Sequence, residues 1–166
     1  MIFNRLFTQY LIENSIIDSD TANDYCQISD ELNAPIYTRL VADEVIDEER
    51  IYQVLADYLG YEYRFYQLSE IDLDFVKEYP RDLLIEYQGV PFELNNDELT
   101  VLGSNPFRIE EFKELLSFGG KKLKFVICTP SQTKRILDYA NNKIQQNAVM
   151  DEYIKNDPLK DDIHLP

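Results

Sequence analysis

An internal repeat with a spacing of 29 residues most constrains how this chain can fold. The segment from Tyr10 to Asp18 aligns with the segment from Arg39 to Asp47. Apolar and acidic residues recur at matching places, so that Leu11, Ile17 and Asp18 correspond to Leu40, Ile46 and Asp47. A repeated unit of this size cannot bury its apolar face alone, so we expect the two copies to pack on each other.

Each copy has the pattern of a helix, a tight turn and a second helix. Asp18 and Asp47 are candidate N-caps, because a carboxylate there accepts bonds from free backbone N–H groups and opposes the positive helix end. After Asp47, apolar residues recur every three or four positions up to a glycine stop at Gly60. We expect a four-helix unit in which four residues are buried, namely Leu11, Ile17, Leu40 and Ile46.

The charge of the chain is uneven and strongly acidic. Residues 1–60 hold 12 acids and 3 bases, a net of −9, and the whole chain has a net charge of −15. Such a surface repels phosphate groups, which argues against a nucleic-acid binder or an anionic-membrane binder. No apolar segment is long enough to span a bilayer. We expect a cytoplasmic protein that does not insert directly into a membrane.

From residue 61 the pattern changes to alternating strands and helices. We expect a short strand over 61–65, short helices over 71–77 and 81–87, a hairpin over 90–103, a helix over 109–118, a strand over 123–128, and a long helix from a Ser131 cap to about residue 147. This order predicts a two-layer α/β sandwich with a small mixed sheet. The fold class is α+β, with an acidic helical subdomain (1–60), a sandwich subdomain (61–147) and a linker or tail (148–166).

Residues for catalysis or metal binding are scarce. Cys26 and Cys128 lie far apart in apolar runs and are expected to be buried thiols, and the single histidine, His164, lies near the C-terminus. That composition disfavours Cys/His zinc sites and nucleophile–histidine catalysis. The segment Gly119–Lys122 lacks the first glycine and the Ser or Thr of a phosphate-binding loop. We therefore expect no catalytic, cofactor-binding or metal-binding residues.

The repeat and the segment after it resemble the N-terminal regulatory region of type II secretion and type IV pilus assembly ATPases. That region has one or two helical units with paired apolar residues, followed by acids and spaced leucines. The matching residues are Leu11–Ile12, Ile16–Asp18, Leu40–Val41, Val45–Asp47, Ile51, Leu55–Ala56 and Leu59–Gly60, then Tyr79–Pro80, Val90–Pro91, Leu99–Val101 and Asn105–Pro106. The resemblance spans roughly residues 6–145.

The resemblance implies a docking and regulatory domain of a hexameric ATPase. Its partner would be the cytoplasmic part of an inner-membrane platform protein, to which it would be recruited at the inner face of the membrane. The catalytic ATPase domain would lie downstream, as a second partner within a longer chain, although a stand-alone homologue is an alternative. An unrelated structural adaptor is a further alternative.

Some members of this family bind cyclic di-GMP, using an Arg-Leu-Gly at the start of each repeat and a Gln near its end. In this chain those places hold Leu6–Thr8 and Pro35–Tyr37, with Ser29 and Tyr58 at the Gln positions, and Arg5 is one residue out of register. Tyr37 removes the glycine that lets backbone approach a ligand. A cyclic di-GMP sensor with a degenerate motif is therefore an alternative function.

Two tyrosines of the helical unit are the candidate partner-binding residues. Tyr52 lies between stripe positions of its helix, and Tyr37 occupies a small-residue place of the repeat. We expect both rings to be exposed, and exposed tyrosines are favoured in protein interfaces. The alternative is that both shield aliphatic neighbours along the surface.

Overall fold

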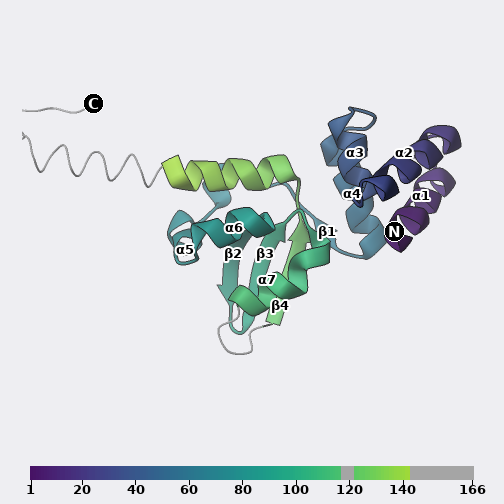
Figure 1. Cartoon of the computed structure of the whole chain (residues 1–166). Coiled ribbons are helices and arrows are strands. Elements are labelled where there is room, and N and C mark those ends of the chain that lie inside the picture. The colour runs from purple at the N-terminus through teal and green to yellow at the C-terminus, as the bar shows by residue number, and fades with distance from the viewer. Residues whose placement is uncertain (117–121, 143–166) are drawn as a thin grey trace, which may run out of the picture.

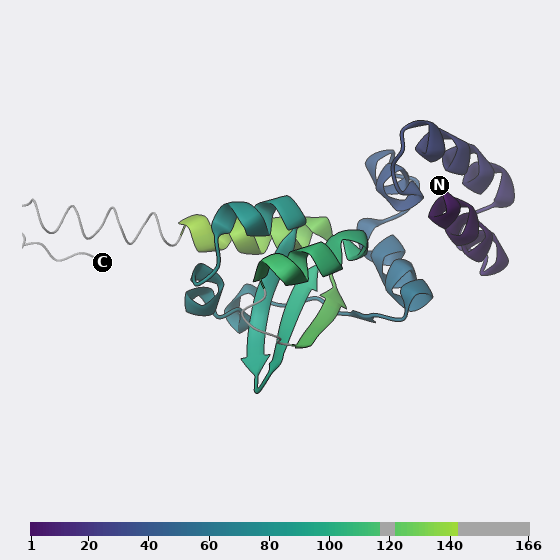
Figure 2. The same cartoon turned by 60° about the horizontal axis from the view of Figure 1, so that its bottom comes forward.

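The computed structural model describes residues 1–116 and 122–142. Four helices come first, and Figures 1 and 2 show them grouped at one end of the molecule. They are α1 (Ile2–Glu13), α2 (Ser19–Glu31), α3 (Ile36–Ala42) and α4 (Glu48–Leu59). We call α1–α4 the helical unit. The predicted helical repeat is thus present.

The turns inside the two repeats have the same geometry, which explains the spacing seen in the sequence. Ser15 and Glu44, at equivalent positions, both have positive φ, 53° and 57°. In each copy the next residue donates its backbone N–H to the carbonyl five residues earlier, Ile16 to Leu11 and Val45 to Leu40, both at 2.9 Å. These bonds close the helix end in the manner of a Schellman motif. Ser15 and Glu44 hold left-handed backbone that glycine adopts with least strain.

The expected caps and buried positions are confirmed only in part. The Asp18 carboxylate accepts from the Thr21 N–H at 2.9 Å, whereas the Asp47 side chain makes no capping bond. Gly60 ends α4 in the left-handed conformation, as expected. Leu11 and Leu40 are fully buried, but Ile17 and Ile46 are half-buried because they lie in the turns at the edge of the unit, outside its helices.

A four-stranded mixed sheet follows the helical unit. Its strands are β1 (Glu62–Tyr63), β2 (Gly89–Asn95), β3 (Glu98–Gly103) and β4 (Lys122–Ile127), in the order β1-β4-β3-β2. β4 runs parallel to both β1 and β3, and β2 and β3 form the predicted antiparallel hairpin. The pairing of β2 shifts between Pro91 and Glu93, where proline cannot donate a ladder bond. The predicted α+β class with a small mixed sheet is confirmed.

Helices pack around this sheet (Figure 1). They are α5 (Leu73–Lys77), α6 (Arg81–Tyr87), α7 (Ile109–Leu116) and a C-terminal helix over residues 130–142, with short 3-10 turns η1 (Leu68–Glu70) and η2 (Pro106–Arg108). Thr129, not Ser131, caps the C-terminal helix, since its Oγ1 accepts from the Gln132 N–H at 3.2 Å. The expected helix end at Phe118, the glycine pair after it and the extension to residue 147 lie outside the described residues.

One apolar core runs from the helical unit into the sheet. It includes Leu11, Leu40 and Leu55 from the helices and Val101 and Ile127 from the strands. Tyr61, just after the helical unit, also packs on the sheet, because its ring meets the Phe125 ring of β4 edge-on with centroids 5.1 Å apart. The helical unit is therefore packed against the part of the chain that follows it.

Candidate functional site

The two tyrosines predicted to bind a partner are buried. Tyr37 is 2% exposed and Tyr52 is 3% exposed, so the expectation of outward rings is wrong. The rings pack edge-on with centroids 5.4 Å apart, and Tyr37 also stacks at 6.5 Å on Phe107, which lies in η2. Burial raises the pKa of both phenols well above the usual value of 10. Their partner-binding role stays a prediction, and exposure no longer supports it.

An aromatic cluster fills the region where α1, α3 and α4 meet. The Phe3 ring lies 5.2 Å from Phe7 and 4.7 Å from Phe107, and the Phe7 ring lies 5.2 Å from Tyr58. Phe107 comes from beyond β3, so this cluster joins the helical unit to the rest of the chain. The apolar periodicity within a single helix cannot reveal a contact with a residue as distant in the sequence as Phe107.

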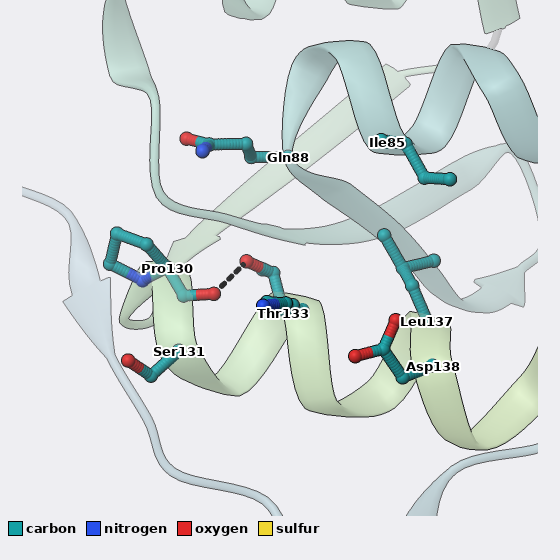
Figure 3. A pocket seen from close by; sticks show the side chains of 8 residues that line it. Ile85, Gln88, Pro130, Ser131, Thr133, Leu137 and Asp138 are labelled. Carbon is teal, nitrogen blue, oxygen red and sulfur yellow. Dashed lines mark hydrogen bonds between the residues drawn. The ribbon is translucent and has the colours of Figure 1, made fainter.

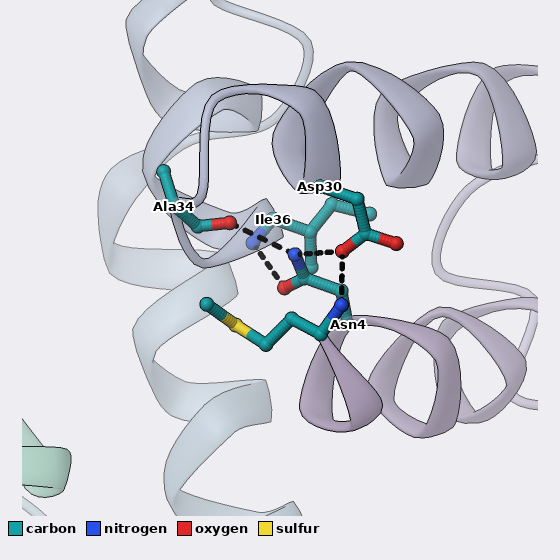
Figure 4. A network of polar contacts seen from close by, with 5 residues as sticks. Asn4, Asp30, Ala34 and Ile36 are labelled. Atoms are coloured by element: carbon teal, nitrogen blue, oxygen red, sulfur yellow. Dashed lines mark hydrogen bonds and ion pairs between the residues drawn. The ribbon is translucent and has the colours of Figure 1, made fainter.

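A buried asparagine ties the two repeats together (Figure 4). Asn4 is fully buried, and its Nδ2 donates to Asp30 Oδ1 at 2.9 Å and to the Ala34 carbonyl at 2.8 Å. Its Oδ1 accepts from the Ile36 N–H at 2.7 Å. The amino group of Met1 also donates to Asp30 at 2.9 Å. The bond from Asn4, followed by that amino group, holds the pKa of Asp30 below its usual value.

The network and the aromatic cluster occupy the places where the family's ligand motif would lie. Phe7, Thr8, Ile36 and Tyr37 are all buried, and Ser29 is buried with no partner for its Oγ among the described residues. No arginine stands at these places. Leu6, however, is 44% exposed, and Pro35 and Tyr58 are half-buried, so the motif places are packed as core only in part.

A second polar contact links α4 to the C-terminal helix. Glu48, the first residue of α4, accepts from the Ser131 N–H at 3.1 Å and from the Ser131 Oγ at 3.0 Å. The carboxylate thus lies at the positive end of the C-terminal helix, whose Ser131 follows Glu48 by 83 positions. Neither Asn4 nor Glu48 was singled out from the sequence. A polar residue inside the apolar face of α1 was the one available signal for Asn4.

A cavity of about 370 Å³ lies between α6 and the C-terminal helix. Figure 3 shows Ile85 and Gln88 on one side and Pro130, Thr133 and Leu137 on the other. The Thr133 hydroxyl is already used, since it donates to the Pro130 carbonyl at 2.9 Å. The surface of the lining is mainly apolar, and its two charged residues, Lys134 and Asp138, form no ion pair within the described residues.

The described residues offer little for catalysis or metal binding. Among them, no group of three or more His, Cys, Asp or Glu side chains is placed to hold a metal ion. Burial raises the pKa of the Cys128 thiol to about 12, so this thiol is inert near neutral pH. His164 lies outside the described part. No helix in that part is long and apolar enough to cross a bilayer.

Residues 59–145 match the family model of the MshEN domain, which is more than half of the chain. The chain belongs to the MshEN domain family. This match confirms the resemblance to the N-terminal region of secretion and pilus assembly ATPases. The MshEN domain is a non-catalytic domain of such an ATPase.

Two solved structures are similar to this chain, and the first of them shares its fold. A structure of MshE with cdg (cyclic di-GMP) matches over 80% of this chain and 96% of its own, with 19% identity and a TM-score of 0.68. The N-terminal domain of XpsE, in crystal form I4122, matches over 81% of this chain and 93% of its own, with 13% identity and a TM-score of 0.49. Comparison with curated proteins gives no match.

Proposed function

We propose that this chain is the docking and regulatory domain of a secretion or pilus assembly ATPase. Its helical unit would bind the cytoplasmic part of an inner-membrane platform protein, and the α/β part would pass that binding to a downstream ATPase domain. In this proposal the chain divides near residue 60, and it is cytoplasmic and recruited to the inner membrane by its partner. Family membership supports the proposal.

The observation that carries this proposal is the side-chain packing at the places where the family's cyclic di-GMP motif would lie. Phe7, Ile36 and Tyr37 fill the motif places as buried core. Residues 1–60 nevertheless keep a net charge of −9 on a folded unit. An acidic surface suits a protein partner with Lys and Arg at its contact face.

Salt dependence tests the docking role. We expect the chain to bind the cytoplasmic domain of the platform protein, with an affinity that falls as NaCl is raised. Asp20 and Asp24 are exposed on α2, and the double variant Asp20→Asn/Asp24→Asn should bind about threefold or more weakly at low salt. The matched control, Glu110→Gln/Glu114→Gln on α7, should bind as the unmodified chain does. Absence of binding by the unmodified chain would contradict the proposal.

The second candidate function is a cyclic di-GMP sensor. It is favoured by one observation, the shared fold with the structure of MshE with cyclic di-GMP. Calorimetry separates the two functions. We expect no saturable heat, because no arginine stands at the motif places to offset the charge of the ligand. Saturable binding at about 10 µM or tighter would support the sensor instead.

A further inference from the structure

A small cavity lies where the helical unit meets the C-terminal helix. Its volume is about 150 Å³, and its lining includes Glu48 and Glu49 of α4, Phe65 after β1, and Gln132 and Arg135 of the C-terminal helix. Cavities that hold whole small-molecule ligands are usually at least about 300 Å³. This one is therefore matched to a single side chain.

Gln132, which lines this cavity, carries a buried hydrogen-bond acceptor without a donor. Gln132 is only 5% exposed, and its Nε2 donates to the Tyr66 carbonyl at 2.7 Å, which fixes the orientation of the amide. Its Oε1 is then buried with no partner among the described residues. A buried acceptor without a donor costs about 1–3 kcal/mol, so a donor brought by a ligand would relieve that cost.

Two carboxylates share the lining of this cavity with Gln132. Glu48 is held in place by Ser131, as described above, whereas Glu49 is exposed and forms no ion pair with any described residue. Phe65 is 48% exposed and offers an aromatic surface at the rim, where a cation is attracted to a ring face. Arg135 is the one cation in the lining, and it too has no ion pair within the described residues.

We propose that this cavity receives one arginine side chain of a protein partner. A guanidinium presents five donors in a planar fork, which suits a carboxylate at Glu49 together with the amide oxygen of Gln132. The proposal rests on the proposed function, because it assigns the docking partner a basic contact residue. It goes beyond that function by naming the receiving site. The negative charge of residues 1–60 favours a basic occupant.

An arginine analogue tests the cavity without the partner. The isotope-labelled full chain is titrated with N-acetyl-L-arginine amide and followed by backbone NMR shifts. We expect saturable shifts confined to the residues around Glu49, Phe65 and Gln132. The neutral analogue N-acetyl-L-citrulline amide should produce no saturable shift there. Shifts spread over all acidic surfaces, or equal shifts from citrulline, would overturn the proposal.

Two charge variants predict effects of opposite sign. Glu49→Gln removes a carboxylate and should weaken binding of the arginine analogue about threefold or more, whereas Arg135→Gln removes a repelling cation and should strengthen it about twofold or more. Both residues are exposed, so the fold should tolerate the changes. The matched control Glu114→Gln on α7 should have no effect. Stronger binding by Glu49→Gln, weaker binding by Arg135→Gln, or no change in either variant would refute the proposal.

Binding of the platform domain separates this proposal from the docking role. If that domain binds the unmodified chain and Glu49→Gln equally well, the arginine site is wrong and docking stands. If that domain does not bind but the arginine analogue does, docking is wrong and the cavity assignment stands.

Discussion

Replacing Asn4 with alanine should destabilise this protein far more than the small size of the asparagine side chain suggests. The side chain is fully buried and makes three hydrogen bonds, two to backbone groups and one to a carboxylate. Ile36 is the first residue of α3, so its N–H has no partner within its own helix. Asn4 therefore caps α3 from a different repeat.

The magnitude follows from what the substitution leaves behind. Asn4→Ala leaves the Ile36 N–H and the Ala34 carbonyl without the asparagine, and a buried group without a partner costs about 1–3 kcal/mol. We expect a loss of about 3–5 kcal/mol in the free energy of unfolding, a large share of the total for a typical domain. The matched control is Asn14→Ala, because Asn14 makes one exposed bond to the Tyr10 carbonyl. That control should change stability by less than about 0.5 kcal/mol.

Urea unfolding followed by circular dichroism and tyrosine fluorescence measures both variants. The chain has 12 tyrosines and no tryptophan, so its fluorescence reports on tyrosine surroundings. The lowered pKa of Asp30 means that its contacts stabilise the fold above its usual value of 3.8 and are lost as pH falls through the lowered value. Asn4→Ala should therefore lose less stability on acidification than the unmodified chain. A loss below about 1 kcal/mol at neutral pH would refute the capping role.

Three further outcomes are expected. Ser15→Gly and Glu44→Gly should each raise the free energy of unfolding by up to about 1 kcal/mol, and with it the melting temperature, because both positions have positive φ. An equal or lower melting temperature would contradict the strained turn. Tyr37→Ala should cost about 3–5 kcal/mol in urea unfolding, because the ring is core; a loss under about 1 kcal/mol would instead place it at the surface. In the native protein at neutral pH, a thiol reagent should modify the half-buried Cys26 and leave Cys128 unmodified, and Cys26→Ser should abolish the reaction.

Local signals were enough to predict much of the fold. The 29-residue spacing indicated the helical repeat because one turn geometry occurs twice. The helix over 81–87 was placed with its observed bounds, since Pro80 fixes its start. The hairpin was found from its alternating apolar residues and the polar turn between them. In each of these cases the residues that decide the structure lie within a few positions of one another.

Contacts between distant segments account for what the sequence did not reveal. Tyr37 is buried partly because Phe107 lies on it, and periodicity within α3 contains no trace of that ring. Ser131 resembled a cap, but its hydroxyl bonds Glu48, and Thr129 caps the helix instead. Likewise, the cavity beside Glu49 exists only because a strand exit and two helix starts converge.

The short strand β1 has a mechanical consequence. It joins the sheet through only two residue pairs, Glu62 with Val126 and Tyr63 with Ile127, directly after the glycine that ends α4. A load pulling the helical unit away from the sheet first separates the Phe3–Phe107 and Glu48–Ser131 contacts and is then transmitted along this connection. The β3–β4 ladder, with six pairs, would outlast it under the same tension. Under force the chain should thus extend first between residues 60 and 65, while the three remaining strands stay paired.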